Sequence, residues 1–198
     1  MFIASCFRNC FDSFRLVSAQ HEMEKKEREN LICLDDEFAC QEVVLLKNAS
    51  RVCGRGGVLG NAPLIQSKSY FEVKILQDGY WSVGIASRST NLESCGGDDS
   101  ESWCLDSLGE VKHNKVQIHK LQKESFQEGD IIGVSYDHVE LNFYLNGKSL
   151  EVPVIGIKGT TFPALHVDNG AILDLIVENF VYTPPMGFDK IMLEQSLL

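Results

Sequence analysis

The sequence predicts an all-β fold, an antiparallel sandwich of two sheets that follows a short N-terminal helical segment. Apolar and polar residues alternate in short runs from residue 31 onward, which is typical of strands with one buried face. Turn residues separate these runs at intervals of about ten residues, a spacing that favours antiparallel strands over strand–helix–strand units. The 198 residues have room for one such domain, so we expect a separate segment at 1–30 and a sandwich at 31–198.

The first 30 residues follow a different pattern. Apolar residues from Ile3 to Val17 recur at the three- and four-residue spacing of a helix, and a mixed-charge run follows at 21–30. This pattern predicts a helix packed on the domain, a frayed tail, or an anchor at a membrane surface. Cys6 and Cys10 lie among aromatic residues near two arginines, so they are candidate S-acylation sites. Two acyl chains hold a protein at a membrane far better than one.

The next stretch contains a hairpin and a glycine-rich run. Val43–Leu46 is apolar and ends in the turn 47–50, which predicts a strand and a hairpin turn. Cys53–Gly60 resembles a phosphate-binding loop in its glycine content, but a dinucleotide-binding loop must open a helix. Here Asn61-Ala62-Pro63 leads into another strand. We therefore interpret these glycines as backbone freedom at a sheet corner.

Two alternating runs follow, at Ser69–Ile75 and Tyr80–Ala86. Only a short turn containing Gln77-Asp78-Gly79 separates them, so we expect the two strands to pair as a hairpin. Gly84 indicates a place where a large neighbour or a bend needs room. The predicted inward rows are Phe71, Val73, Ile75, Trp81, Val83 and Ile85.

Ser87–Ser102 is the longest stretch without a strand pattern in the predicted sandwich. It is polar and rich in glycine, and long ordered loops often carry binding function. Short strands are predicted after it, around Trp103-Cys104-Leu105 and at Val111-Lys112-His113. We expect Trp103, which borders the loop, to cover the core.

The clearest strand pattern lies at Gly129–Leu150. An apolar run ends at Asp137-His138, two residues that tolerate turn conformations. Asn146-Gly147 then predicts a tight type I′ turn, which requires positive φ at both central residues. Three strands of one antiparallel sheet are therefore expected here, and the second is predicted to turn four side chains inward: Val139, Leu141, Phe143 and Leu145.

The C-terminal part adds two strands and an extended end. Thr161–Val167 and Ala171–Val177 are the predicted strands, and Asp168-Asn169-Gly170 is the turn between them. Pro184-Pro185 keeps the segment Tyr182–Phe188 extended, and we expect this segment to leave the sheet.

Composition limits the function. The net charge is −10, with 18 basic and 28 acidic residues, and this acidity argues against general nucleic-acid binding. Seven cysteines are an odd number and no secretory signal is evident, so we expect an intracellular, cytoplasmic protein with reduced thiols. No apolar run approaches the roughly 20 residues that span a bilayer.

The sequence shows no catalytic or metal-binding pattern. Ser135, Asp137 and His138 are near neighbours on a predicted strand and turn, where adjacent side chains point in opposite directions, so they do not form a triad. Cys6 and Cys10 are the only near cysteine pair, and a zinc site needs a second pair. We predict no enzymatic activity, no cofactor and no metal.

Several of these runs, taken together and in order, resemble the SPRY (B30.2-like) domain family: SYFEVKI, WSVGIA, EGDIIGVSYD, LNFYLNGK, TFPALHV and a last strand ending in PPMGF. The resemblance covers about residues 53–188. It implies a bent two-sheet sandwich of the concanavalin-like jelly-roll type, whose loops at one end recognise partners. Family members act as adaptors, often as substrate receptors of ubiquitin ligases. Asp168 and Asn169 stand where some members carry an aromatic residue that binds peptides.

We therefore predict a monomeric, non-enzymatic module that binds a peptide or protein through these loops. Their acidic residues favour a basic or amide-rich partner. One alternative is a membrane-tethered scaffold that contacts the membrane through residues 1–17. Another is a lectin-like binder of sugar or another small ligand, which would need aromatic platforms and paired acids or amides in one loop cluster. The candidate partner-binding residues are Arg51, Arg55, Asp98, Asp99, Glu101, Trp103, Asp137, His138, Asp168 and Asn169.

Overall fold

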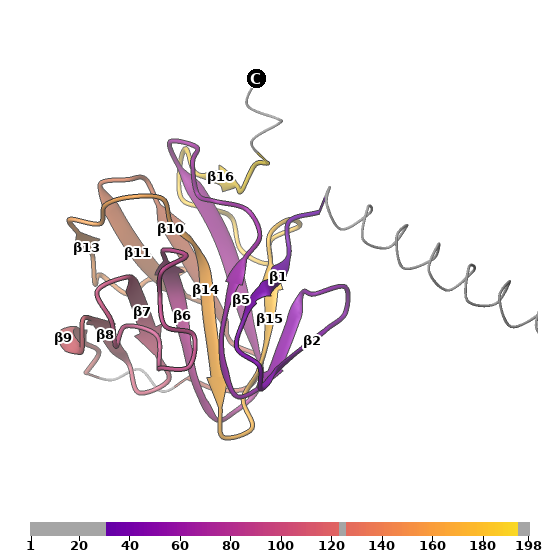
Figure 1. Ribbon diagram of the computed structural model, residues 1–198. Helices are drawn as coiled ribbons and strands as arrows, with labels where there is room; N and C mark the ends of the chain where they lie inside the picture. Colours follow the sequence, from indigo (N-terminus) through magenta and orange to yellow (C-terminus); the bar gives the residue numbers. More distant parts are fainter. Residues whose placement is uncertain (1–30, 123–125, 194–198) are drawn as a thin grey trace, which may run out of the picture. The chain divides into compact units, whose positions relative to one another are not determined.

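The computed structural model describes residues 31–122 and 126–193, and the chain from Ile32 onward forms one compact unit. Its regular elements are all strands, which lie in two sheets stacked face to face (Figure 1). The helical segment predicted at 1–30, with Cys6 and Cys10, lies outside the described residues, so the expectations for it remain predictions. Within the described residues there is no helix with the length and apolar character needed to cross a bilayer.

Sheet A has seven strands in the order β1-β4-β14-β6-β7-β8-β9, and every neighbouring pair is antiparallel. The predicted strands around residues 103–105, 111–113 and 161–167 all belong to it. The strands are β1 (Leu34–Ala39), β4 (Gly56–Gly60), β6 (Tyr80–Ala86), β7 (Ser102–Asp106), β8 (Glu110–His113), β9 (Val116–Lys120) and β14 (Phe162–Asp168).

Sheet B has nine strands. Seven follow the order β12-β11-β10-β5-β15-β3-β2, while β13 pairs with β11 and β16 pairs with β5. All of these pairs are antiparallel except β16 with β5. The strands are β2 (Val43–Leu46), β3 (Arg51–Gly54), β5 (Ser69–Gln77), β10 (Ile131–Tyr136), β11 (Glu140–Leu145), β12 (Lys148–Ser149), β13 (Val154–Ile155), β15 (Ile172–Ile176) and β16 (Asp189–Lys190).

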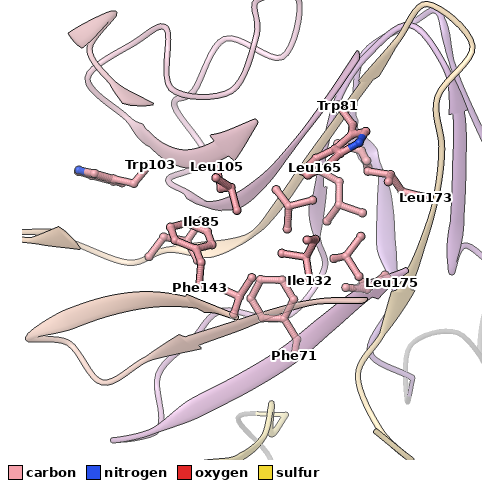
Figure 2. Packing of buried hydrophobic residues seen from close by; sticks show 14 of the residues in the cluster. Phe71, Trp81, Ile85, Trp103, Leu105, Ile132, Phe143, Leu165, Leu173 and Leu175 are labelled. Carbon is pink, nitrogen blue, oxygen red and sulfur yellow. The ribbon is translucent and has the colours of Figure 1, made fainter. Parts of the chain in front are cut away.

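The core lies between the two sheets (Figure 2). The predicted inward rows of residues 71–75 and 81–85 are confirmed, because all six side chains are buried in one cluster. Trp81 is fully buried, and Trp103 lies at the margin of the labelled cluster with 8% of its surface exposed. The three-strand meander is also confirmed as β10, β11 and β12, and its Asn146-Gly147 turn has positive φ at both residues.

The glycine-rich run is a sheet corner, as predicted. β3 belongs to sheet B and β4 to sheet A, so the chain crosses from one sheet to the other at Arg55. Gly54 and Gly56 on either side have φ values of 98° and 118°, a conformation that side chains other than glycine rarely adopt. A Cβ atom on Gly54 would also collide with the backbone of Glu42.

The predicted hairpin between Ser69–Ile75 and Tyr80–Ala86 is wrong. β5 belongs to sheet B, where β10 and β15 occupy its two edges, whereas β6 belongs to sheet A between β14 and β7. The short turn that ends at Gly79 carries the chain from one sheet to the other. Both strands turn an apolar row toward the same core, so alternation predicted their faces correctly but not their partners.

One further expectation is wrong, and one strand was not predicted. Val139 was expected to face inward, but it lies in the turn after β10 and is 70% exposed. β1 was not predicted, because its Asp35-Asp36-Glu37 run lacks an apolar alternation. It is nevertheless a strand paired with β4 at the edge of sheet A.

The C-terminal segment, defined as residues 178–192, was expected to leave the sheet, but it returns to it. It crosses the outer face of sheet B, and β16 then pairs with the beginning of β5. The carboxylate of Glu72, which is fully buried, accepts hydrogen bonds from the backbone N–H groups of Val181 (2.7 Å) and Tyr182 (3.0 Å). The ring of Phe180 packs edge-on against Tyr70, at 4.9 Å between centroids. The outer face of β5 is therefore covered by these residues.

Candidate functional site

The long loop after β6, residues 87–101, folds back over the outer face of sheet A. Gly57 of β4 donates its backbone N–H to the carbonyl of Leu92 at 2.7 Å. The backbone N–H of Lys115 donates to the carbonyl of Gly97 at 3.0 Å. Small side chains make this close approach feasible. A Cβ atom on Gly96 would meet the Ser82 hydroxyl and the Cys104 thiol. The loop is thus a packed layer on the sheet.

Asp99 holds this loop together from inside. One carboxylate oxygen accepts hydrogen bonds from the Thr90 hydroxyl (2.8 Å) and the Asn91 N–H (2.7 Å). The other accepts from the Glu101 N–H (2.9 Å) and the Ser102 hydroxyl (2.7 Å). Burial opposes ionisation of Asp99, but these hydrogen bonds hold its pKa below the ordinary value. Both oxygens are therefore engaged within the loop.

Glu101 and Trp103 also make internal contacts. Glu101 closes the base of the loop, because its carboxylate accepts a hydrogen bond from the Ser87 hydroxyl. Trp103 stacks on His113 with 4.6 Å between ring centroids and an interplanar angle of 8°. The structure therefore shows Trp103 as a cover of the core, as the sequence predicted.

Four predicted partner-binding residues gather at one end of sheet A. Arg55 at the sheet corner lies 3.6 Å from the carboxylate of Asp168 at the end of β14, and its side chain is 70% exposed. Asn169 follows in an exposed tight turn with φ of 51°. Asp98 comes from the long loop and is close enough to act electrostatically on His166 of β14. We call Arg55, Asp98, Asp168 and Asn169 the loop-end surface.

Two aromatic residues that the sequence analysis did not select lie beneath this surface. Tyr80 and His166 meet edge-on at 6.0 Å between centroids. Burial raises the pKa of Tyr80, and the neighbouring side chains of Cys95, Asp106 and Asp98 act in the same direction. Burial lowers the pKa of His166, so its ring is neutral at pH 7, although the nearby Asp168 and Asp98 carboxylates oppose this effect.

A cavity of about 20 Å³ lies between the loop and the sheet, lined by residues that include Ser82, Leu92 and His166. Such a volume holds about one water-sized group. A macromolecular partner therefore has more surface available on the exposed rim than inside this cavity.

The other predicted residues lie elsewhere. Arg51 forms a two-pronged ion pair with Asp174 on the outer face of sheet B, with Nε–Oδ1 at 2.7 Å and Nη2–Oδ2 at 2.9 Å. Asp137 and His138 follow β10, whose last residue pairs with Ser69 at the start of β5. The loop-end surface lies beyond the other end of β5, so these two residues belong to the opposite end of the sandwich.

The residues considered for catalysis have other contacts. The Ser135 hydroxyl lies 3.3 Å from the Tyr144 hydroxyl, and His138 Nε2 lies 3.0 Å from the carbonyl of Gln66. Asp137 accepts hydrogen bonds from the N–H groups of Val139 and Glu140 and so shapes its own turn. Among the described residues, no group of three or more His, Cys, Asp or Glu side chains is placed to hold a metal ion.

Comparison with known proteins identifies the family. The SPRY domain family model matches residues 68–179. SPRY domain-containing protein 7 of Homo sapiens is 46% identical over 166 residues, which are 83% of this chain and 85% of that protein. The chain belongs to the SPRY domain family. The equivalent protein of Mus musculus has the same identity and coverage.

Solved structures agree with the SPRY fold. The SPRY domain of human HERC1 matches with a TM-score of 0.58 and 18% identity, and the match covers 74% of this chain and 99% of that one. The TRIM65 PSpry domain matches with a TM-score of 0.61 and 17% identity, covering 79% of this chain and 95% of that one. At this identity the similarity shows the fold alone. The predicted family and the two-sheet sandwich are both confirmed.

Proposed function

We propose that this SPRY domain binds a protein partner through the loop-end surface, with no catalytic step. SPRY domains are in general protein-interaction modules. One observation carries the choice of surface: Arg55 of the sheet corner pairs with Asp168 at the end of β14, and Asp98 of the long loop is near enough to act electrostatically on His166 of the same strand. The side chains there are exposed or partly exposed, whereas Asp99 and Glu101 are occupied within the loop.

Charge favours a basic partner segment. The loop-end surface carries two carboxylates, Asp98 and Asp168, against one guanidinium, that of Arg55, which pairs with Asp168, and the chain as a whole is acidic. Like charges repel across an interface, while complementary charges increase the association rate and the specificity. A lysine- or arginine-containing segment that meets the two carboxylates is therefore the preferred ligand.

Affinity purification with quantitative mass spectrometry tests the proposal. The bait is the full chain, compared with the double substitution Asp98→Asn/Asp168→Asn, which keeps side-chain size and removes the charge. Glu151→Gln is the matched control, because Glu151 is an exposed acid in the segment after β12 of sheet B. We expect at least one partner to be lost with the double variant and kept with the control. Equal recovery of every partner by all three baits would contradict the proposal.

A second proposal rests on the sequence of the first 17 residues, and it is the membrane-tethered scaffold. Fractionation of cells that express Cys6→Ser/Cys10→Ser protein tests it. Release from the membrane fraction relative to the unchanged chain is expected under this proposal. An unchanged distribution would contradict it.

A further inference from the structure

β2 is an unusual edge strand. It lies at the end of sheet B, where β3 is its neighbour in the sheet, and Figure 1 shows it at the margin of the described fold. Its four residues, Val43–Leu46, are all aliphatic, and their register with β3 is continuous. Val44 and Leu46 are 51% and 48% exposed. An uncharged apolar edge with a continuous register is a template for pairing with another chain.

The other edges of the two sheets are protected against such pairing. β1 carries three consecutive acids, Asp35-Asp36-Glu37, and its register with β4 is irregular. β9 has an irregular register with β8 and ends in Lys120. β12 and β13, which both pair with β11, have only two residues each, and β12 includes Lys148. Charges, bulges and short length are the usual means by which proteins prevent edge-to-edge association. Val43–Leu46 carries no charge, and its register with β3 is unbroken.

The hydrogen-bond pattern of β2 shows which backbone groups face the open edge. Arg55 donates its N–H to the carbonyl of Glu42 at 3.0 Å, so Glu42 belongs to a bonded pair with Arg55. Bonded and non-bonded pairs alternate along an antiparallel ladder. The next bonded positions on β2 are therefore Val44 and Leu46. The N–H and carbonyl of Leu45 consequently point away from β3.

We propose that β2 pairs with β2 of a second copy of this chain, antiparallel about a two-fold axis through Leu45. The two Leu45 residues would then exchange their outward N–H and carbonyl groups. Val44 would face Leu46 of the second copy, and Leu46 would face its Val44, on the outer face of the joined sheets. Every exposed aliphatic side chain of β2 thus gains an aliphatic partner.

Charge also selects this arrangement. Glu42 precedes the strand and is exposed. Lys47 follows it; its side chain contacts Asp174 of the same chain at 3.2 Å and is still 63% exposed. Antiparallel pairing brings Glu42 of one copy to the Lys47 end of the other. Parallel pairing would instead place like charges side by side. The sequence alone predicted a monomer, and this edge is the reason to infer a dimer.

Sedimentation velocity of the full chain over a wide concentration range tests the dimer. The variant Leu46→Lys places a charge in the paired row, and Val116→Lys on β9 is the matched control at a residue that is 61% exposed. We expect the unchanged chain and the control to associate as concentration rises, with the dimer of Leu46→Lys weaker by about tenfold or more. A chain that stays monomeric throughout, or a Leu46→Lys variant that associates normally, would overturn the proposal. The second result would assign association to another surface.

Disulfide trapping tests the register. Val44→Cys protein mixed with Leu46→Cys protein should form a linked dimer under mild oxidation, because these positions face each other across the axis. Each variant alone should link less, and the unsubstituted chain gives the background from the natural cysteines. A mixture that links no better than its two components would contradict the register.

Discussion

The outer faces of the two sheets are covered in different ways. Sheet A is covered by residues 87–101, a loop whose hydrogen bonds through Asp99 join it to itself and to the start of β7. Sheet B is covered by the C-terminal segment, which donates backbone hydrogen bonds to Glu72, a residue of the sheet itself. The first cover is held mainly by hydrogen bonds within the loop, beside the backbone bond from Gly57 of β4 to Leu92, and it carries exposed charge at its rim. The second is bonded into the sheet, so we expect it to contribute mainly to stability.

The largest expected effect on stability comes from replacing the buried carboxylate of Glu72. Glu72→Gln keeps the shape but replaces one oxygen with an NH₂ group that faces a backbone N–H donor. We expect the free energy of unfolding to fall by about 3 kcal/mol, because hydrogen bonds to a charged acceptor are lost and a donor is left unpaired. Chemical denaturation measures this change. Hydrogen exchange should show faster exchange at Val181 and Tyr182.

The exposed loop acid Glu93 is the control for this measurement, and Glu93→Gln should change stability by less than about 0.5 kcal/mol. If Glu72→Gln were equally neutral, the C-terminal segment would not depend on the carboxylate, and the contrast between the two covers would be lost.

A smaller effect is expected in the loop over sheet A. Asp99→Asn replaces one acceptor oxygen with a donor, and we expect a loss of about 2 kcal/mol at pH 7. The folded pKa of Asp99 is lowered, so the stability that it contributes is present above the unfolded pKa near 3.9 and is lost as pH falls through the folded pKa. The difference between the unchanged chain and the variant should therefore shrink at acidic pH. A difference independent of pH would show that the Asp99 charge is not the cause.

The smallest effect on stability is expected at the loop-end surface. Asp98→Asn/Asp168→Asn should change the free energy of unfolding by less than about 0.5 kcal/mol, because Asn at 168 can still accept the N–H of Asn169. The same variant should lose a protein partner. Thermal unfolding of the affinity bait checks the first point. A strongly destabilised double variant would mean that these acids support the fold, so that a lost partner would no longer identify a binding surface.

The sequence predicted the strands well wherever alternation was clear. Period two shows which side chains face the core, and the rows from Phe71 to Ile85 follow it closely. It contains no information about which strand lies beside which. For this reason the proposed β5–β6 hairpin was wrong although both faces were right. β1 was not predicted because its sequence lacks apolar alternation. It can still be a strand, because an edge strand tolerates acids that a central strand does not.

The candidate site could be predicted only in part. Turn and loop signals in the sequence select Arg55, Asp98, Asp168 and Asn169 as candidates but do not show that they lie close together. Their meeting depends on the pairing of β14 with β4 and β6, which are far from it in sequence. The position of Arg51 against Asp174 depends on the pairing of β3 with β15 and was not visible in the sequence either. Sequence showed which residues are polar and exposed, while long-range pairing decided which of them share a surface.

The most direct test of the contrast between the two covers is hydrogen–deuterium exchange of the full chain with and without a partner recovered by the affinity experiment. The account predicts that the partner slows exchange in residues 92–98 and 168–170 and leaves residues 178–190 unchanged. Protection confined to residues 178–190, with no change around Asp98 and Asp168, would contradict it.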